Sequence, residues 1–117
     1  MTGGLLLCDD LLFASKVTAT AAAHGLAVRV CKTPAALAQG LSVPPAAVIL
    51  DLQTLGLNVA ELLAGLKDPR PRVIGFGSHV DKDTLDAAKA AGCDEVMPRS
   101  KFAKELETNL AKWLAGN

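Results

Sequence analysis

The sequence lacks the features that mark several classes of protein, beginning with net charge. Lys plus Arg and Asp plus Glu are equal, at 12 each in 117 residues, so no net charge attracts nucleic acid or an anionic membrane. No apolar run approaches the roughly 18 residues of a membrane span, and the amino terminus has no charged signal-peptide start. We therefore expect a cytoplasmic protein that binds no nucleic acid and forms a single domain over residues 1–117.

Cysteine and aromatic residues are also scarce. The three cysteines, Cys8, Cys31 and Cys93, have neither CxxC nor zinc-ligand spacing, which favours reduced, buried thiols over a metal site. Aromatic residues make up 3% of the chain and Tyr is absent, although hydrophobic residues make up 50%. Walker A and GxGxxG phosphate-binding loops are missing as well. The composition is typical of alanine-rich helices packed on a sheet of Leu, Val and Ile.

The apolar segment that precedes Asp51 is the most informative stretch of the chain. Residues 46–50 (AAVIL) follow two prolines and are typical of a strand that is buried on both faces of a parallel sheet. Asp51 falls where this strand is expected to end. In open α/β sheets, ligands bind beyond the carboxyl ends of the strands. Asp51 is therefore either a site residue or a residue that only satisfies nearby backbone N–H groups.

Strand and helix patterns alternate along the chain. Strands are expected at 4–8, 27–31, 46–50, 72–76 and 95–97, and helices at 12–23, 34–40, 59–66 and 82–91. A last helix carries an apolar stripe at helical spacing: Phe102, Leu106, Leu110, Trp113 and Leu114. Fivefold βα alternation predicts a parallel sheet with helices on both faces. We expect the α/β class and a single-domain, flavodoxin-like (βα)5 doubly wound fold with strand order 2-1-3-4-5.

This strand order brings polar residues together at the carboxyl edge of the sheet. Asp9 and Asp10 follow the first strand, Asp51 the third, residues 77–79 the fourth and Arg99 the fifth. Three clustered carboxylates repel one another unless a cation is present, and hard oxygen ligands suit Mg²⁺. With the metal bound, Asp51 could act as a nucleophile toward phosphorus.

Three motifs carry a resemblance to a known family. LLCDD at 6–10, VILD at 48–51 and AAGCD at 90–94 resemble the receiver domain of bacterial two-component response regulators, over nearly the whole chain. The resemblance implies that Asp51 is the phosphoacceptor and that Mg²⁺ is held by Asp9, Asp10, Asp51 and the backbone carbonyl of Gln53. It also implies a receiver-like protein without an output domain. No enzymatic activity is expected beyond self-phosphorylation and dephosphorylation at an aspartate.

The same resemblance shows departures at the residues that couple phosphorylation to a change of shape. Gly77 stands where receivers carry Thr or Ser, and Ser78, one residue later, can substitute only if its loop shifts. Val96 stands at the aromatic switch position. Arg99 replaces the usual Lys and Ser100 the Pro that follows it, and Arg is no neutral replacement because its guanidinium is planar and bidentate. The acid pocket is retained, whereas the switch is lost.

Each candidate site residue also has a structural interpretation. Asp9 and Asp10 could cap the first helix, although the acid after the third strand favours a shared pocket. Arg99 is explained equally well as a counter-ion of the acid cluster and as a contact to a phosphoryl group. Ser78 is typical of a turn, and His79 of a surface loop.

Two functions stay open at this point. The first is a phosphorelay receiver in which Asp51 takes a phosphoryl group from a histidine kinase or a small donor, assisted by Mg²⁺. The second is a pseudo-receiver that binds a partner without phosphotransfer, which the missing switch residues favour. Expected partners are a histidine kinase or another signalling protein. A homodimer through the face of the fourth helix, fifth strand and fifth helix is a further possibility.

Overall fold

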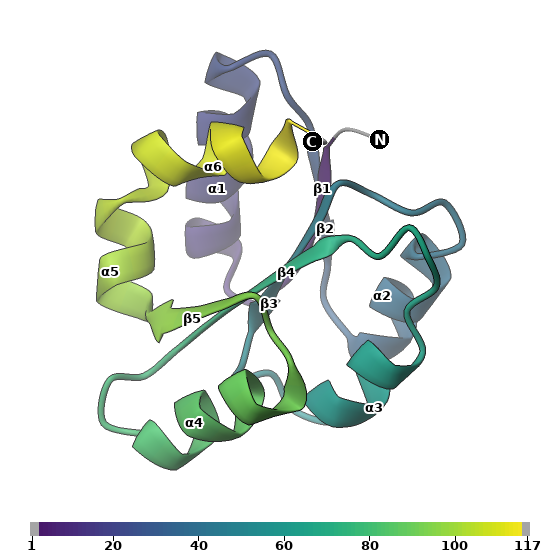
Figure 1. Cartoon of the computed structure of the whole chain (residues 1–117). Helices are drawn as coiled ribbons and strands as arrows, with labels where there is room; N and C mark the ends of the chain where they lie inside the picture. The colour runs from purple at the N-terminus through teal and green to yellow at the C-terminus, as the bar shows by residue number, and fades with distance from the viewer. Residues whose placement is uncertain (1–2, 116–117) are drawn as a thin grey trace.

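The structure, a computed structural model, describes residues 3–115, which form one five-stranded parallel sheet with the order β2-β1-β3-β4-β5 (Figure 1). The strands are β1 (Gly4–Leu7), β2 (Val28–Cys31), β3 (Ala47–Asp51), β4 (Arg72–Gly77) and β5 (Glu95–Pro98). The predicted fold class and strand order are confirmed. The predicted strand ends are wrong by one residue in places, and Asp51 is the last residue of β3 rather than the first after it.

The helices are α1 (Leu11–Ala23), α2 (Pro34–Gly40), α3 (Val59–Ala64), α4 (Lys82–Ala91), α5 (Arg99–Lys104) and α6 (Leu106–Leu114). Capping side chains fix several of their starts, because Thr33, Asn58 and Asp81 each accept an N–H from three residues later. The predicted end of α3 at residue 66 is wrong by two residues. Gly65 ends the helix by donating its N–H to carbonyls of the last turn.

Both faces of the sheet are covered by helices (Figure 1). Leu6 and Ile49 belong to the core beneath α1, α5 and α6, whereas Leu7 and Leu50 belong to the core on the other face, with α2, α3 and α4. Every residue of β3 is buried, as predicted for a strand covered on both faces. The cysteines are free and buried, also as predicted. Within residues 3–115, no helix has the length and apolar character needed to cross a membrane.

The carboxyl-terminal helix differs from the prediction. The predicted stripe from Phe102 to Leu114 is buried throughout, but the chain breaks at Glu105 into α5 and α6, so a single last helix is wrong. The helix α5 packs against β4 and β5, whereas α6 turns across α1 (Figure 1). Both pieces use the same apolar spacing, which is why the sequence pattern runs through the break. Arg99 is the first residue of α5, directly after β5.

Candidate functional site

The strand register brings the acidic residues to one edge of the sheet. Leu7 of β1 pairs with Leu50 of β3, so the residues that follow β1 lie beside Asp51. Asp51 in turn pairs with Phe76 of β4, and Gly77 pairs with Pro98, the residue before Arg99. The residues expected at this edge from sequence therefore come from neighbouring strands.

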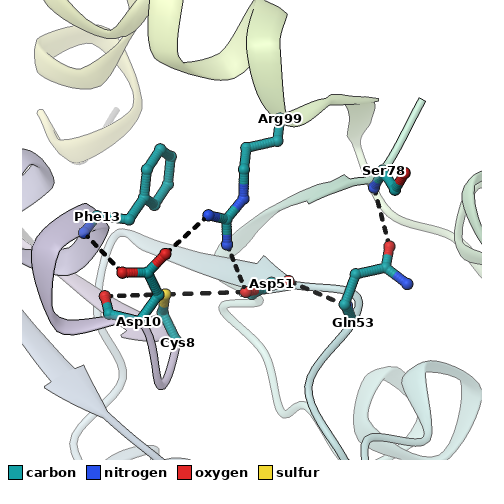
Figure 2. Close-up of polar contacts among 7 residues, drawn as sticks. All are labelled: Cys8, Asp10, Phe13, Asp51, Gln53, Ser78 and Arg99. Carbon is teal, nitrogen blue, oxygen red and sulfur yellow. Dashed lines mark hydrogen bonds and ion pairs between the residues drawn. The ribbon is translucent and has the colours of Figure 1, made fainter. Parts of the chain in front are cut away.

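Asp51 is nearly enclosed, with only 6% of its side chain exposed. Its Oδ1 accepts the backbone N–H of Gln53 at 3.0 Å, and its Oδ2 accepts a hydrogen bond from Nη2 of Arg99 at 2.9 Å (Figure 2). The thiol of Cys8 donates to the same Oδ2 at 3.8 Å. Burial raises the pKa of Cys8 and outweighs the opposing contact with the Asp10 backbone, and the charge of Asp51 raises the pKa further, so this thiol stays protonated beside the carboxylate.

Asp10 has two roles. It is the N-cap of α1, and its Oδ1 accepts the N–H of Phe13 at 3.1 Å. Its Oδ2 accepts a hydrogen bond from Nη1 of Arg99 at 3.0 Å. The Phe13 N–H, and then Arg99, lower the pKa of Asp10. The capping and pocket interpretations of Asp10 are therefore compatible, because each uses a different carboxylate oxygen.

Arg99 joins the two carboxylates. From the start of α5 its guanidinium reaches Asp10 and Asp51 at once, and it lies 4.4 Å from the ring centre of Phe13 and 5.4 Å from that of Phe76. Burial opposes its charge, but the bond to Asp10 and the charge of Asp51 prevail and raise the pKa of Arg99. Both rings present their faces to this cation, an arrangement that favours its positive charge.

Gln53 links the loop after β3 to the loop after β4. Its Oε1 accepts the backbone N–H of Ser78 at 2.9 Å (Figure 2), and its Nε2 donates to Asp81 at 3.1 Å. A Cβ added to Gly77 would lie 2.5 Å from this Oε1. The Gln53 amide thus fills the space that a Thr or Ser side chain at position 77 would need. Sequence reasoning used only the backbone carbonyl of Gln53, and no local pattern points to this role of its side chain.

The remaining predicted residues lie farther out. Asp9 is exposed to solvent, whereas Asp10 and Asp51 are joined by the guanidinium of Arg99; the role of Asp9 at this edge stays a prediction. The Ser78 hydroxyl accepts the N–H of Val80 at 3.3 Å, as in a turn, and His79 is exposed. The rings of Phe13 and Phe76, which support Arg99, were not singled out from the sequence.

The fit of the acid pair to a divalent cation depends on Arg99. Among residues 3–115, no group of three or more His, Cys, Asp or Glu side chains is arranged to hold a metal ion. Mg²⁺ commonly needs only one or two carboxylates, with carbonyls and waters completing its shell, so Asp10, Asp51 and the Gln53 carbonyl suit it chemically. The point at which the two carboxylates meet is taken by the guanidinium.

The lowered pKa of Asp10 predicts a contribution to stability that depends on pH. Because the folded-state pKa lies below the unfolded one, this contribution is complete above about pH 4 and is lost as the pH falls through the folded value. We expect the melting temperature of wild type to fall more steeply below about pH 4 than that of Asp10→Asn. Thermal melts from pH 6 to pH 2.5, roughly the range in which a carboxyl titrates, measure this. Parallel acid slopes would contradict the assignment.

Comparisons with known proteins agree with the fold. A scan against protein-family models finds no match to this chain, and a search of curated proteins finds no similar sequence. A response regulator (signal receiver domain) from Bermanella marisrubri has a similar structure, with a TM-score of 0.80 and 19% sequence identity, over 94% of this chain and 95% of that chain.

Two further solved structures extend the comparison. NtrX from Brucella abortus, in complex with ADP, has a TM-score of 0.78 and 19% identity over 97% of this chain, which spans only 27% of that longer chain. A response regulator from Burkholderia pseudomallei, with a phosphorylated aspartic acid, a calcium ion and citrate, has a TM-score of 0.73 and 20% identity over 98% of this chain and 72% of that chain. The sheet, its strand order and these likenesses agree: this chain has the fold of response-regulator receiver domains.

Proposed function

We propose that this protein is a receiver of phosphorelay signal transduction and that Asp51 is its phosphoacceptor. One observation carries the proposal: Asp10 and Asp51, from the ends of two neighbouring strands, direct their Oδ2 atoms at a single cation. A buried carboxylate beside a second carboxylate and a cation is suited to attack phosphorus, because the cation offsets the repulsion between two anions.

The proposed reaction transfers one phosphoryl group. A carboxylate oxygen of Asp51 attacks the phosphorus of a phosphohistidine on a kinase, so that an O–P bond forms as the P–N bond breaks. The leaving imidazole nitrogen takes a proton from solvent. Arg99 can pair bidentately with the phosphoryl oxygens, and Ser78 can reach them only if its loop shifts. The acyl phosphate formed on Asp51 is then hydrolysed, and we propose no other reaction at this site.

We propose Mg²⁺ as the cofactor of this step. Asp10, Asp51 and the backbone carbonyl of Gln53 would hold it, with Asp9 acting from the outer edge through water. A bound Mg²⁺ would supply positive charge to the phosphoryl oxygens.

A second candidate is a pseudo-receiver that acts by protein contact without phosphotransfer. Gly77 supports it, since this residue carries no hydroxyl and the Gln53 amide lies where a side chain at position 77 would begin. Large apolar side chains are exposed around the carboxyl edge of the sheet that carries Asp10 and Asp51 (the acid edge). Leu12, in the first turn of α1, is 86% exposed, and Leu55 and Val80, in the loops after β3 and β4, are 92% and 79% exposed. Such side chains favour a protein partner, for which we propose a histidine kinase or another signalling protein. The homodimer through α4, β5 and α5 stays a prediction.

Phosphorylation with a small donor separates the two candidates. Wild type incubated with phosphoramidate and Mg²⁺ should gain the mass of one phosphoryl group, measured on the intact protein. Asp51→Asn should gain nothing, because its amide is not a nucleophile toward phosphorus. Asp83→Asn, an exposed acid on α4, is the matched control and should behave as wild type. No gain in wild type, or the same gain in Asp51→Asn, would reject Asp51 as the phosphoacceptor.

A further inference from the structure

In the two carboxylates at the acid edge, Asp10 and Asp51, the two oxygens have the same division of hydrogen bonds. In both Asp10 and Asp51, Oδ1 accepts a backbone N–H, from Phe13 at 3.1 Å and from Gln53 at 3.0 Å. The first of these bonds caps α1, and the second shapes the turn after β3. The other oxygen of each residue, Oδ2, is the one that contacts the cation shared by the two carboxylates.

Both Oδ2 atoms are already bound by one guanidinium. Nη1 of Arg99 is 3.0 Å from Asp10 and Nη2 is 2.9 Å from Asp51, so the fork of the side chain spans the pair (Figure 2). The guanidinium carbon also lies over the ring of Phe13, 4.4 Å from its centre. A guanidinium is permanently protonated and offers only donors, so it cannot join a metal's ligand shell.

We propose that Arg99 is the resident cation of this site and that a divalent metal ion binds Asp10 and Asp51 only by displacing it. A metal ion on either Oδ2 would lie against the guanidinium, and the two positive charges would repel strongly beside a carboxylate that is 6% exposed. Arg99 is 37% exposed, so its side chain has a path to solvent. The inference rests on the acid edge being the working site of the proposed function.

Displacement has a structural consequence. In this structure Arg99 joins the first residue of α5 to Asp10, beyond the end of β1, and to Asp51, at the end of β3. Metal binding removes both bonds and frees the start of α5, so metal occupancy and the position of this helix end are coupled. The net free energy of metal binding is therefore the free energy gained at the two carboxylates less the free energy needed to release Arg99.

Calorimetric titration with Mg²⁺ tests the proposal. Arg99→Gln should bind Mg²⁺ at least about tenfold more tightly than wild type, because hydrogen bonds between charged groups no longer have to be broken. Arg29→Gln, an exposed change on β2 that removes the same charge, should bind as wild type does. Equal tightening in both variants would assign the effect to net charge and overturn the proposal.

A conservative variant guards against loss of folding in Arg99→Gln. Arg99→Lys keeps the charge, but a lysine ammonium cannot form the parallel fork, so its Mg²⁺ affinity should lie between those of wild type and Arg99→Gln. The rise in melting temperature on adding Mg²⁺ should follow the same order. Equal affinities, or no Mg²⁺ binding to any of the three proteins, would overturn the inference. Tighter Mg²⁺ binding without phosphorylation of Asp51 would uphold it and reject the phosphoacceptor function.

Discussion

Replacing Phe102 with alanine should lower the free energy of unfolding by about 3–5 kcal/mol and the melting temperature by roughly 10–20 °C. Phe102 is fully buried in α5, where its ring lies 4.6 Å from that of Phe76 and 5.7 Å from that of Trp113. Removing the ring leaves a cavity between stacked aromatic side chains, which cannot close without moving the helix. Denaturant unfolding with a two-state fit measures the change.

Removal of the Phe102 ring should also weaken the support of Arg99 at the acid site. Phe76 stacks on Phe102, and the guanidinium carbon of Arg99 lies 5.4 Å from the centre of the Phe76 ring. Phe102→Leu is the matched control, since it keeps most of the buried volume and should cost less than about half as much. A difference of under about 1 kcal/mol between wild type and Phe102→Ala would show that the ring cluster is not the support assigned to it.

Much of the fold could be predicted from sequence because its signals are local. The run before Asp51 gave a strand covered on both faces, and Asp81 and Gly92 bracketed α4 at the predicted residues. The break at Glu105 could not be predicted in this way. It arises because α5 packs on β4 and β5 while α6 packs on α1, and both use one apolar spacing. Tertiary packing, rather than local preference, decides where the helix divides.

The candidate site was predictable as a set of residues but not as a geometry. The acids could be placed at one edge because parallel strands end together, and Arg99 could be placed there too. Whether Arg99 contacts one acid or both depends on side chains that lie 48 and 89 residues apart in the chain. The packing of Gln53 against Gly77 is likewise a tertiary contact, so the missing hydroxyl alone did not reveal what fills its place.

Beryllofluoride, which mimics a phosphoryl group on an aspartate, should give a response confined to the acid edge. Phosphorylation moves an equilibrium only through its differential interaction with two states. In receivers that difference comes from a hydroxyl drawn toward the phosphoryl group and an aromatic ring that follows it inward. Here Gln53 fills the space beside Gly77, and Val96 has no ring to move. The site therefore lacks both the hydroxyl and the aromatic ring that couple phosphorylation to a change of shape.

The NMR spectrum of the labelled protein, recorded with Mg²⁺ before and after beryllofluoride is added, tests this directly. Resonances near Asp10, Asp51 and Arg99 should shift, and Asp51→Asn should show no such shifts. The face that carries Lys89, Glu95 and Lys104 should stay unchanged, because Glu95 is held by the Trp113 Nε1–H at 2.7 Å, independently of the acids. Release of Arg99 could move only the start of α5, so the effect should fade along that helix. Large shifts across the whole α4, β5 and α5 face would contradict the pseudo-receiver candidate and require a working switch that uses neither position 77 nor position 96.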